Sequence, residues 1–156
     1  MRMKTIIISF LISILIVAGG CLKDTSCVAK TVASEDADML SYAAANGMSV
    51  TRHSSGMYYE IINPGSGPVP NFNSILSVRY TGKLMNGTIF DSRTTTPVNL
   101  QLSQVIAGWQ LGLQLLQKGG VIKLIIPSSM GYGCQPAGTI PGNSILFFEI
   151  ELVDVQ

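Results

Sequence analysis

The stretch QVIAGWQLGLQLLQKGG, residues 104–120, decides the fold class, because its large apolar residues recur at helical spacing. These residues are Ile106, Trp109, Leu113 and Leu116. Positions three and four apart lie on one side of a helix, so the spacing predicts a helix with one buried side. Gly119 follows it and is typical of a residue that ends a helix. One helix within a run of strands predicts an α+β domain, an antiparallel sheet with a helix across one face.

Short runs of apolar residues surround this helix and are separated by Gly, Pro and Asn. The predicted strands are MYYEII (57–62), SILSVRYTGKL (74–84), TIFD (88–91), PVNLQL (97–102), VIKLII (121–126) and SILFFEIELVDV (144–155). In the last of them, apolar residues alternate with Glu149 and Glu151, which is typical of a half-buried antiparallel strand. Asn86-Gly87 favours a tight turn, so residues 80–93 are expected to form a hairpin.

A shorter helix is expected before the sheet. Ser34-Glu35-Asp36 supplies a capping hydroxyl and two acids for a first turn, and Asn46-Gly47 would end the helix. Its apolar side comprises Met39, Leu40, Tyr42 and Ala43. The sequence leaves open whether this helix docks on the domain or acts as a spacer. Residues 48–56 are expected to be a connector.

The N-terminus has the pattern of a secretory signal. Arg2 and Lys4 precede an apolar run, and small residues follow it directly before Cys21. The run is shorter than the roughly 20 apolar residues that a membrane-spanning helix needs. Small residues before a cysteine resemble the lipobox of bacterial lipoproteins, which implies that Cys21 becomes an acylated first residue and anchors the chain to a membrane. A signal peptide cut nearby and an uncleaved N-terminal anchor are the alternatives.

These features divide the chain into a signal peptide (1–20), a lipidated tether with a short helix (21–56) and a C-terminal domain (57–156). The resemblance to lipoproteins implies a bacterial cell-envelope location, on the periplasmic face or at the outer membrane. No aspartate directly follows Cys21, and by resemblance to the lipoprotein sorting rule this favours the outer membrane.

Composition argues against several classes of function. Apolar residues make up 47% of the chain and charged residues 12%. Without residues 1–20, eight of the ten basic residues remain against nine acidic ones, a net charge of −1 with no basic patch for nucleic acid. His53 is the single histidine and has no companion for a metal site or a hydrolytic triad. Cys27 and Cys134 can pair in an oxidising compartment or remain two separate thiols.

Four blocks in the C-terminal part carry a family resemblance. They are VRYTGKLMNGTIFDS (78–92), QVIAGWQLGL (104–113), IPSSMGYG (126–133) and TIPGNSILFFEIEL (139–152). Their order and spacing resemble the FKBP-type peptidyl-prolyl cis-trans isomerases, and the resemblance covers residues 57–156. It implies a strongly bent antiparallel sheet wrapped over one short helix, in agreement with the fold class expected from the residues themselves.

The resemblance also implies an apolar pocket for proline. The residues implied to be catalytic are Tyr80, Phe90, Asp91, Ile106, Trp109, Tyr132 and Phe148, and those implied to bind substrate are Val98, Val105 and Ile140. Two positions depart from the family pattern, since Val98 and Leu100 stand where the family usually has phenylalanines.

The implied roles differ among these residues. Trp109 matches the indole that forms the pocket floor, and Asp91 matches the lone charged group, with Arg93 expected to pair with it. The backbone N–H of Ile106 resembles a donor that holds a ligand carbonyl, and the hydroxyl of Tyr132 matches a donor to a second carbonyl. The other residues match apolar walls and rim.

The implied reaction is rotation about an X-Pro peptide bond, which breaks no bond and needs no nucleophile, metal or cofactor. The implied partners are proline-containing stretches of exported proteins, macrolide-type inhibitors and a membrane through the lipid anchor, with the chain expected to be a monomer. Two alternatives remain. The domain would bind proline segments as a chaperone module with little isomerase activity, or it would be a structural envelope lipoprotein with a vestigial pocket.

Overall fold

The computed structural model describes residues 27–156 of the chain. The expected signal peptide (1–20) and Cys21 lie outside the described residues. Among residues 27–156, no helix is long and apolar enough to cross a membrane. Within the same range, no group of three or more His, Cys, Asp or Glu side chains is placed to hold a metal ion.

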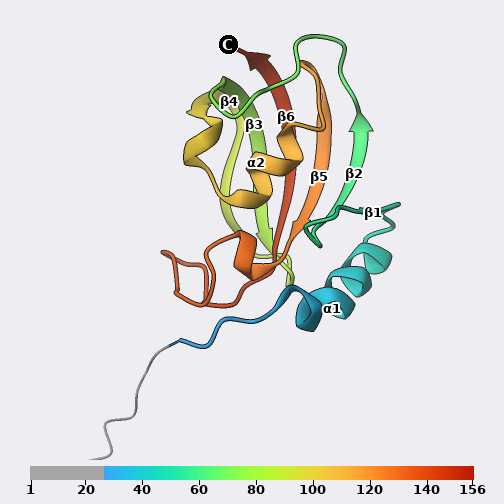
Figure 1. Cartoon of the computed structure of the whole chain (residues 1–156), viewed down its shortest axis with the longest axis vertical. Coiled ribbons are helices and arrows are strands. Elements are labelled where there is room, and N and C mark those ends of the chain that lie inside the picture. Colours follow the sequence, from blue (N-terminus) through green and yellow to red (C-terminus); the bar gives the residue numbers. More distant parts are fainter. Residues whose placement is uncertain (1–26) are drawn as a thin grey trace, which may run out of the picture.

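A six-stranded antiparallel sheet forms the body of the domain, in the order β1-β2-β5-β6-β3-β4 (Figure 1). The strands are β1 (Thr51–Arg52), β2 (Tyr58–Asn63), β3 (Ile75–Leu84), β4 (Ile89–Gln101), β5 (Val121–Ile126) and β6 (Leu146–Val155). The helices are α1 (Val32–Ala45) and α2 (Ala107–Leu113), with short 3-10 turns at η1 (Leu102–Gln104) and η2 (Ser128–Met130). The expected α+β fold is confirmed, with α2 lying across one face of the curved sheet (Figure 1).

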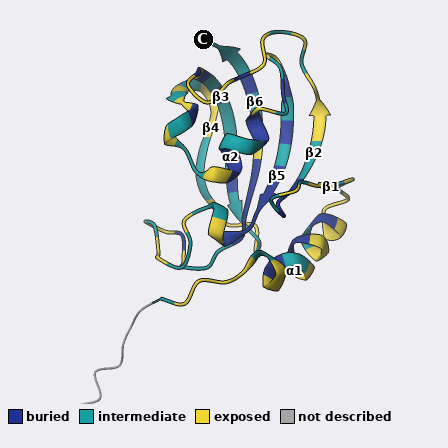
Figure 2. Ribbon diagram, in the orientation of Figure 1, coloured by how far each residue is buried: buried dark blue, intermediate teal, exposed yellow. Residues whose placement is uncertain are grey.

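The main core lies between α2 and the sheet. Its buried residues include Trp109 and Leu113 of α2, Leu124 and Ile126 of β5, and Leu146, Phe148, Ile150 and Leu152 of β6. Gly108 allows the close approach of α2, because a Cβ atom there would lie 2.5 Å from the side chain of Ile126. Because Leu146, Phe148, Ile150 and Leu152 all lie in this core, the alternation expected in the last strand is confirmed. Figure 2 shows β5 and β6 as the most continuously buried strands.

The helix α1 packs against the opposite face of the sheet. Of the two possibilities that the sequence left open, the helix therefore docks on the domain and is not a spacer. Met39 and Ala43 of α1 form a second core cluster with Tyr58, Ile125 and Phe147. Ile125 and Phe147 alternate along β5 and β6 with residues of the main core, so they point to the other side of the sheet. The solvent side of α1 is exposed (Figure 2).

Four boundaries differ from the sequence prediction. The N-cap of α1 is Thr31, three residues before the expected capping residue Ser34, and the helix ends at Ala45 with Asn46 as its C-cap, as expected. The helix α2 ends at Leu113 instead of Gly119, because the chain turns there and the Gln117 N–H donates to Pro64 O at 2.8 Å. The predicted strands 88–91 and 97–102 are one strand, β4. The expected connector 48–56 contains β1, which pairs with β2.

Of the two states left open for Cys27 and Cys134, the structure has the disulfide. Their Cα atoms lie 5.5 Å apart across a sequence separation of 107 residues. The bond joins the segment before α1 to the long loop between β5 and β6.

Candidate functional site

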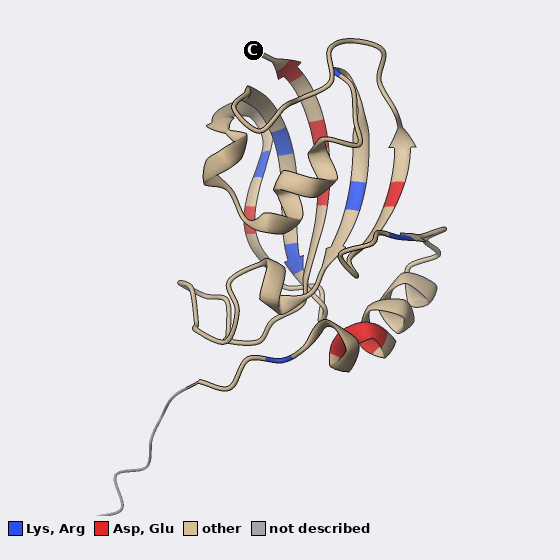
Figure 3. Ribbon diagram, in the orientation of Figure 1, with Lys and Arg blue, Asp and Glu red and all other residues tan. Residues whose placement is uncertain are grey.

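One cavity of about 480 Å³ opens between the first turn of α2, the strands β3, β4 and β6, and the loop that follows β5. Its lining residues are Tyr80, Phe90, Asp91, Leu100, Gln104, Val105, Ile106, Trp109, Tyr132, Ala137, Gly138, Thr139, Ile140 and Phe148. All the residues that the sequence implied for a pocket are among them, with one exception. Asp91 is the one charged member of this lining, and Figure 3 shows the whole of α2 and the loop after β5 without acidic or basic residues.

Val98 is the exception. It is partly buried, pairs with Val78 across β3 and β4, and packs against the main core. Leu100, two residues further along β4, lines the cavity in its place. The side-chain period of two in a strand places both residues on one face, so only the register between β3 and β4 decides which of them reaches the cavity.

Sequence reasoning missed Gln104 and the three loop residues Ala137, Gly138 and Thr139 as lining residues. Gln104 lies one residue before Val105, so proximity to the expected rim was a usable signal. The loop residues have no periodic pattern and no distinctive chemistry. Their place in the lining follows from the path of the loop after β5.

Four aromatic rings form the floor and walls of the cavity. The Trp109 indole is 4% exposed. Its centroid lies 5.0 Å from the Tyr80 ring and 5.1 Å from the Phe148 ring, both in edge-to-face contact. The Phe90 and Phe148 rings meet at 5.5 Å in the same way. Edge-to-face pairs fix the relative orientation of rings, so the apolar surface is preformed.

Gly82 of β3 makes room for two of these rings. A Cβ atom at Gly82 would lie 2.7 Å from both the Phe90 and the Phe148 ring. Any side chain at this position would displace one ring from the cavity wall. The Tyr-Thr-Gly part of the first sequence block therefore contributes both a wall residue, Tyr80, and the space behind the neighbouring wall.

The carboxylate of Asp91 is held by three groups. The Tyr80 hydroxyl donates to Asp91 Oδ2 at 2.5 Å, and the Ser92 N–H donates to Oδ1 at 2.8 Å. The Arg93 guanidinium lies 3.6 Å from Oδ1, so the expected pairing with Asp91 is confirmed. Burial, and then the hydrogen bond to Asp91, raise the pKa of Tyr80 to about 12. Tyr80 is therefore a neutral donor, and Asp91 serves to fix its ring.

The hydrogen-bonding groups that face a ligand are few. The Ile106 residue is the N-cap of α2, and its carbonyl accepts from the N–H groups of Trp109 and Gln110. None of the hydrogen bonds among residues 27–156 uses the Ile106 N–H or the Tyr132 hydroxyl, and Tyr132 is 44% exposed at the rim. Both groups line the cavity and can donate to carbonyls of a bound chain.

Such an arrangement suits a reaction without bond cleavage. The lining offers an apolar volume for a ring of proline size and two donors for flanking carbonyls. Its single carboxylate is already hydrogen-bonded. The titratable side chains of the lining are Tyr80, Asp91 and Tyr132, and the first two are hydrogen-bonded to each other.

Comparison with known proteins gives a consistent family. Residues 67–153 match the model of the FKBP-type peptidyl-prolyl cis-trans isomerases. A probable FKBP-type peptidyl-prolyl cis-trans isomerase of Haemophilus influenzae is 44% identical over 127 residues, which are 80% of this chain and 53% of that protein. The FkpA isomerase of Escherichia coli K12 is 39% identical over 69% of this chain and 40% of its own length. The chain thus spans about half the length of the curated relatives it matches.

Solved structures agree with the sequence comparison. The crystal structure of FkpA from Escherichia coli superposes with a TM-score of 0.72 at 36% identity, over 80% of this chain and 61% of that one. A peptidyl-prolyl cis-trans isomerase from Pseudomonas syringae superposes with a TM-score of 0.68 at 34% identity, over 81% of this chain and 97% of that one. With its fold, its cavity and the match over residues 67–153, the chain belongs to the FKBP-type peptidyl-prolyl cis-trans isomerase family.

Proposed function

We propose that this chain is a peptidyl-prolyl cis-trans isomerase that assists the folding of exported, proline-containing polypeptides at a bacterial cell envelope. The observation that carries the proposal is the preformed aromatic cavity whose one charged lining residue is already hydrogen-bonded. Family membership supports the same reaction.

The reaction has a barrier of about 18–20 kcal/mol, because resonance gives the C–N bond partial double-bond character. Near the top of the barrier the amide is twisted and its charge separation is reduced. An apolar cavity disfavours the planar, more polar ground state relative to the twisted form, which is how differential binding accelerates a reaction. Each 1.36 kcal/mol of this preference gives about a tenfold rate increase.

The residues take roles that match their positions. The Trp109 indole receives the proline ring, and the surrounding apolar side chains exclude water. The Ile106 N–H and the Tyr132 hydroxyl hold the carbonyls that flank the proline. The Tyr80 ring forms a wall whose orientation Asp91 fixes. Macrolide-type inhibitors would compete for the same cavity.

The envelope location rests on the signal-like residues 1–20 and on Cys21 as a lipidated residue. A disulfide between Cys27 and Cys134 supports an oxidising compartment, because thiols stay reduced in the cytosol. A Cys21→Ala variant expressed in a bacterial host tests the anchor. It is expected to lose the incorporation of labelled palmitate that the wild-type chain shows, and equal labelling of the two chains would contradict lipidation of Cys21.

The activity is tested with a protease-coupled assay on a proline-containing tetrapeptide, using the purified full chain. The wild-type chain should accelerate cis-to-trans conversion, with Trp109→Ala reducing kcat/KM about 10- to 100-fold and Tyr132→Phe reducing it less. No acceleration at micromolar protein would contradict the isomerase. If the peptide still quenched or shifted Trp109 fluorescence, the proline-binding chaperone module would replace it.

A further inference from the structure

The loop between β5 and β6 carries part of the cavity lining but has little regular structure of its own. Residues 127–145 contain the turn η2 and an isolated bridge between Ala137 and Ile140, and otherwise lack strands or helices. The same loop supplies Tyr132, Ile140 and the three residues before Ile140 to the lining. Its position therefore depends on contacts with other parts of the chain. Figure 1 shows the segment before α1 running beside this loop.

The first contact is a buried carboxylate from α1. Glu35 is 0% exposed, and its Oε2 accepts the backbone N–H of Ser128 at 2.8 Å. Ser128 is the first residue of η2 and lies four residues before Tyr132. Glu35 Oε1 and Ser128 Oγ are both buried without a partner among residues 27–156. Burial of a carboxylate costs free energy. The docking of α1 does not need this carboxylate, because the apolar cluster of α1 and the sheet already supplies the docking surface. We therefore assign the Glu35 carboxylate to holding the loop through Ser128.

The second contact is a side-chain amide at the far end of the loop. Asn143 has φ 57°, the one positive value outside glycine among the described residues. Its Oδ1 accepts the Lys30 N–H at 3.1 Å, and its Nδ2 donates to Val28 O at 2.9 Å. Its own N–H donates to Gly133 O at 2.8 Å, next to Tyr132. Asparagine tolerates this left-handed conformation, so one residue closes the loop and attaches it to the N-terminal segment.

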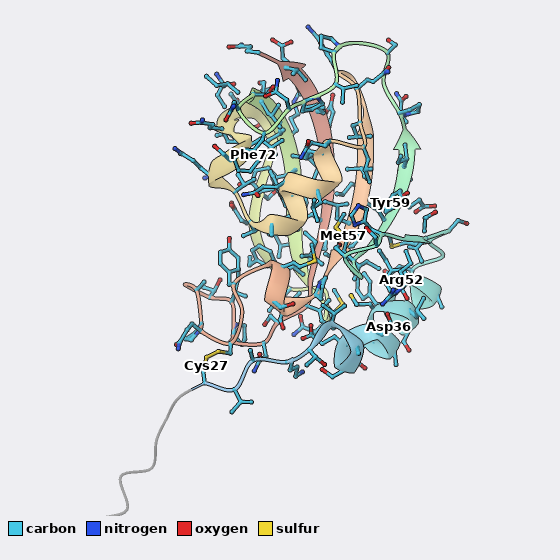
Figure 4. The ribbon with its side chains drawn as sticks, in the orientation of Figure 1. Cys27, Asp36, Arg52, Met57, Tyr59 and Phe72 are labelled. Carbon is cyan, nitrogen blue, oxygen red and sulfur yellow. A yellow bond between two sulfur atoms is a disulfide. The ribbon has the colours of Figure 1, made fainter. Side chains whose placement is uncertain are left out.

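The third contact is covalent. The disulfide joins Cys27 to Cys134, which lies two residues after Tyr132, and Figure 4 shows Cys27 at the loop. The three contacts involve different residues of the loop and come from residues 27–35 alone. None of these N-terminal residues lines the cavity.

We propose that residues 27–35 position the 128–143 loop and so complete the proline cavity, with Glu35 and Asn143 as positioning residues. The catalytic part of this inference rests on the proposed function. When the loop is released, it occupies the binding-competent position for a smaller fraction of the time, and the apparent affinity for substrate falls by that fraction. The effect belongs to KM, because the aromatic floor lies on α2 and the sheet and is unaffected.

The test compares four variants of the purified, disulfide-bonded full chain in the peptide assay. Glu35→Ala removes the acceptor, and Glu35→Gln keeps an oxygen that can accept the Ser128 N–H. Asn143→Gly keeps the backbone conformation without strain but loses both amide contacts. Tyr58→Phe is the matched control, since its hydroxyl donates to Asp36 at 3.0 Å, which links β2 to α1, and makes no hydrogen bond to residues 128–143. Figure 4 shows Asp36 beside Arg52, with which it forms an ion pair.

Glu35→Ala and Asn143→Gly should raise KM roughly 3- to 10-fold with kcat changed less than about 2-fold. Glu35→Gln and Tyr58→Phe should keep KM within about 2-fold of the wild-type value. Hydrogen exchange should accelerate in residues 128–143 of the first two variants and not in the control. If Glu35→Ala and Tyr58→Phe changed KM and the exchange of residues 128–143 equally, the inference would be overturned, because α1 would then act only through overall stability. Unchanged KM and unchanged exchange in Asn143→Gly would also overturn it.

Failure of the proposed function has a different signature. If the wild-type chain does not accelerate proline isomerisation, the isomerase proposal fails whatever the variants do. The exchange measurement then decides the inference alone. Faster exchange confined to residues 128–143 in Glu35→Ala and Asn143→Gly supports a loop held by residues 27–35, and unchanged exchange refutes it.

Discussion

At the scale of single residues, aromatic and apolar side chains form the surface of the cavity, and the polar group Asp91 holds one of them in place. Asp91 is the residue that first suggests acid or base chemistry, yet its oxygens accept hydrogen bonds from Tyr80 and Ser92 and form an ion pair with Arg93. A carboxylate engaged in this way orients its neighbours. The sequence predicted the pairing with Arg93 from the family resemblance, whereas the bond to Tyr80 depends on the pairing of β3 with β4 and has no signal in either segment alone.

The first prediction concerns Asp91. Asp91→Leu removes the partner of the Tyr80 hydroxyl and should lower kcat/KM about 3- to 30-fold, while activity remains measurable because the apolar cavity persists. The peptide assay measures this ratio, with Trp109→Ala expected to lose more. Complete loss of activity in a folded Asp91→Leu protein, judged by circular dichroism, would show that Asp91 acts directly on the substrate.

The second prediction uses the pKa of Tyr80, which burial and the bond to Asp91 raise from 10.0 to about 12. The folded state therefore keeps the Tyr80 proton at a pH where the unfolded chain has lost it. Stability from this group is fully present below pH 10 and is lost as the pH rises from 10 to about 12. Urea denaturation at several pH values measures the loss. Because Tyr42 and Tyr58 also have raised pKa values, the comparison is with Tyr80→Phe, whose stability should fall less over this window.

At the scale of helices and strands, local patterns predicted what lies in the core and missed what pairing alone creates. The strands β2, β3, β5 and β6 fall within two residues of their predicted ends, because their apolar alternation is a property of each segment. The middle of β4, Arg93-Thr-Thr-Thr-Pro97, has no alternation, and residues 94–97 have no partner in β3 because the register shifts between Val78 and Tyr80. The strand is one element because β3 pairs with β4 on both sides of this irregularity. The two-residue β1 likewise depends on β2.

The same distinction explains the cavity lining. The floor and wall residues carry recognisable aromatic chemistry in fixed order, so the sequence predicted Tyr80, Phe90, Trp109 and Phe148 as lining residues. That Leu100 lines the cavity instead of Val98 depends on the strand register, and the presence of residues 137–139 in the lining depends on how the loop is held. The local sequence pattern predicts neither of these features.

The third prediction tests the docking of α1. Met39 is 0% exposed in the second core cluster, so Met39→Ala should lower the free energy of unfolding by about 2–5 kcal/mol. Chemical denaturation measures the change. Leu40→Ala is the matched control, because Leu40 is 43% exposed and its truncation should cost well under half as much. Equal, small effects of the two substitutions would mean that α1 is a spacer after all.

At the scale of the whole molecule, the chain is closed by one covalent bond between its N-terminal segment and a loop near its other end. The residues between Cys27 and Cys134 include both helices and all strands except β6. A cross-link over such a long segment restricts the unfolded chain strongly, since the stabilisation grows with the length of the closed loop. The bond therefore has a global role in addition to its contact with the cavity loop.

The last prediction follows from the length of the segment that the Cys27–Cys134 disulfide closes. A double Cys27→Ser, Cys134→Ser variant should lose about 2–4 kcal/mol of stability against the oxidised chain. The same loss should appear when the wild-type chain is measured in a reducing agent, whereas the variant should not respond to the reagent. Glu35 and Asn143 still hold the loop in this variant, so its KM should rise less than that of Glu35→Ala. A variant that matched the oxidised wild-type chain in stability would show that the native packing, and not the cross-link, holds the N-terminal segment in place.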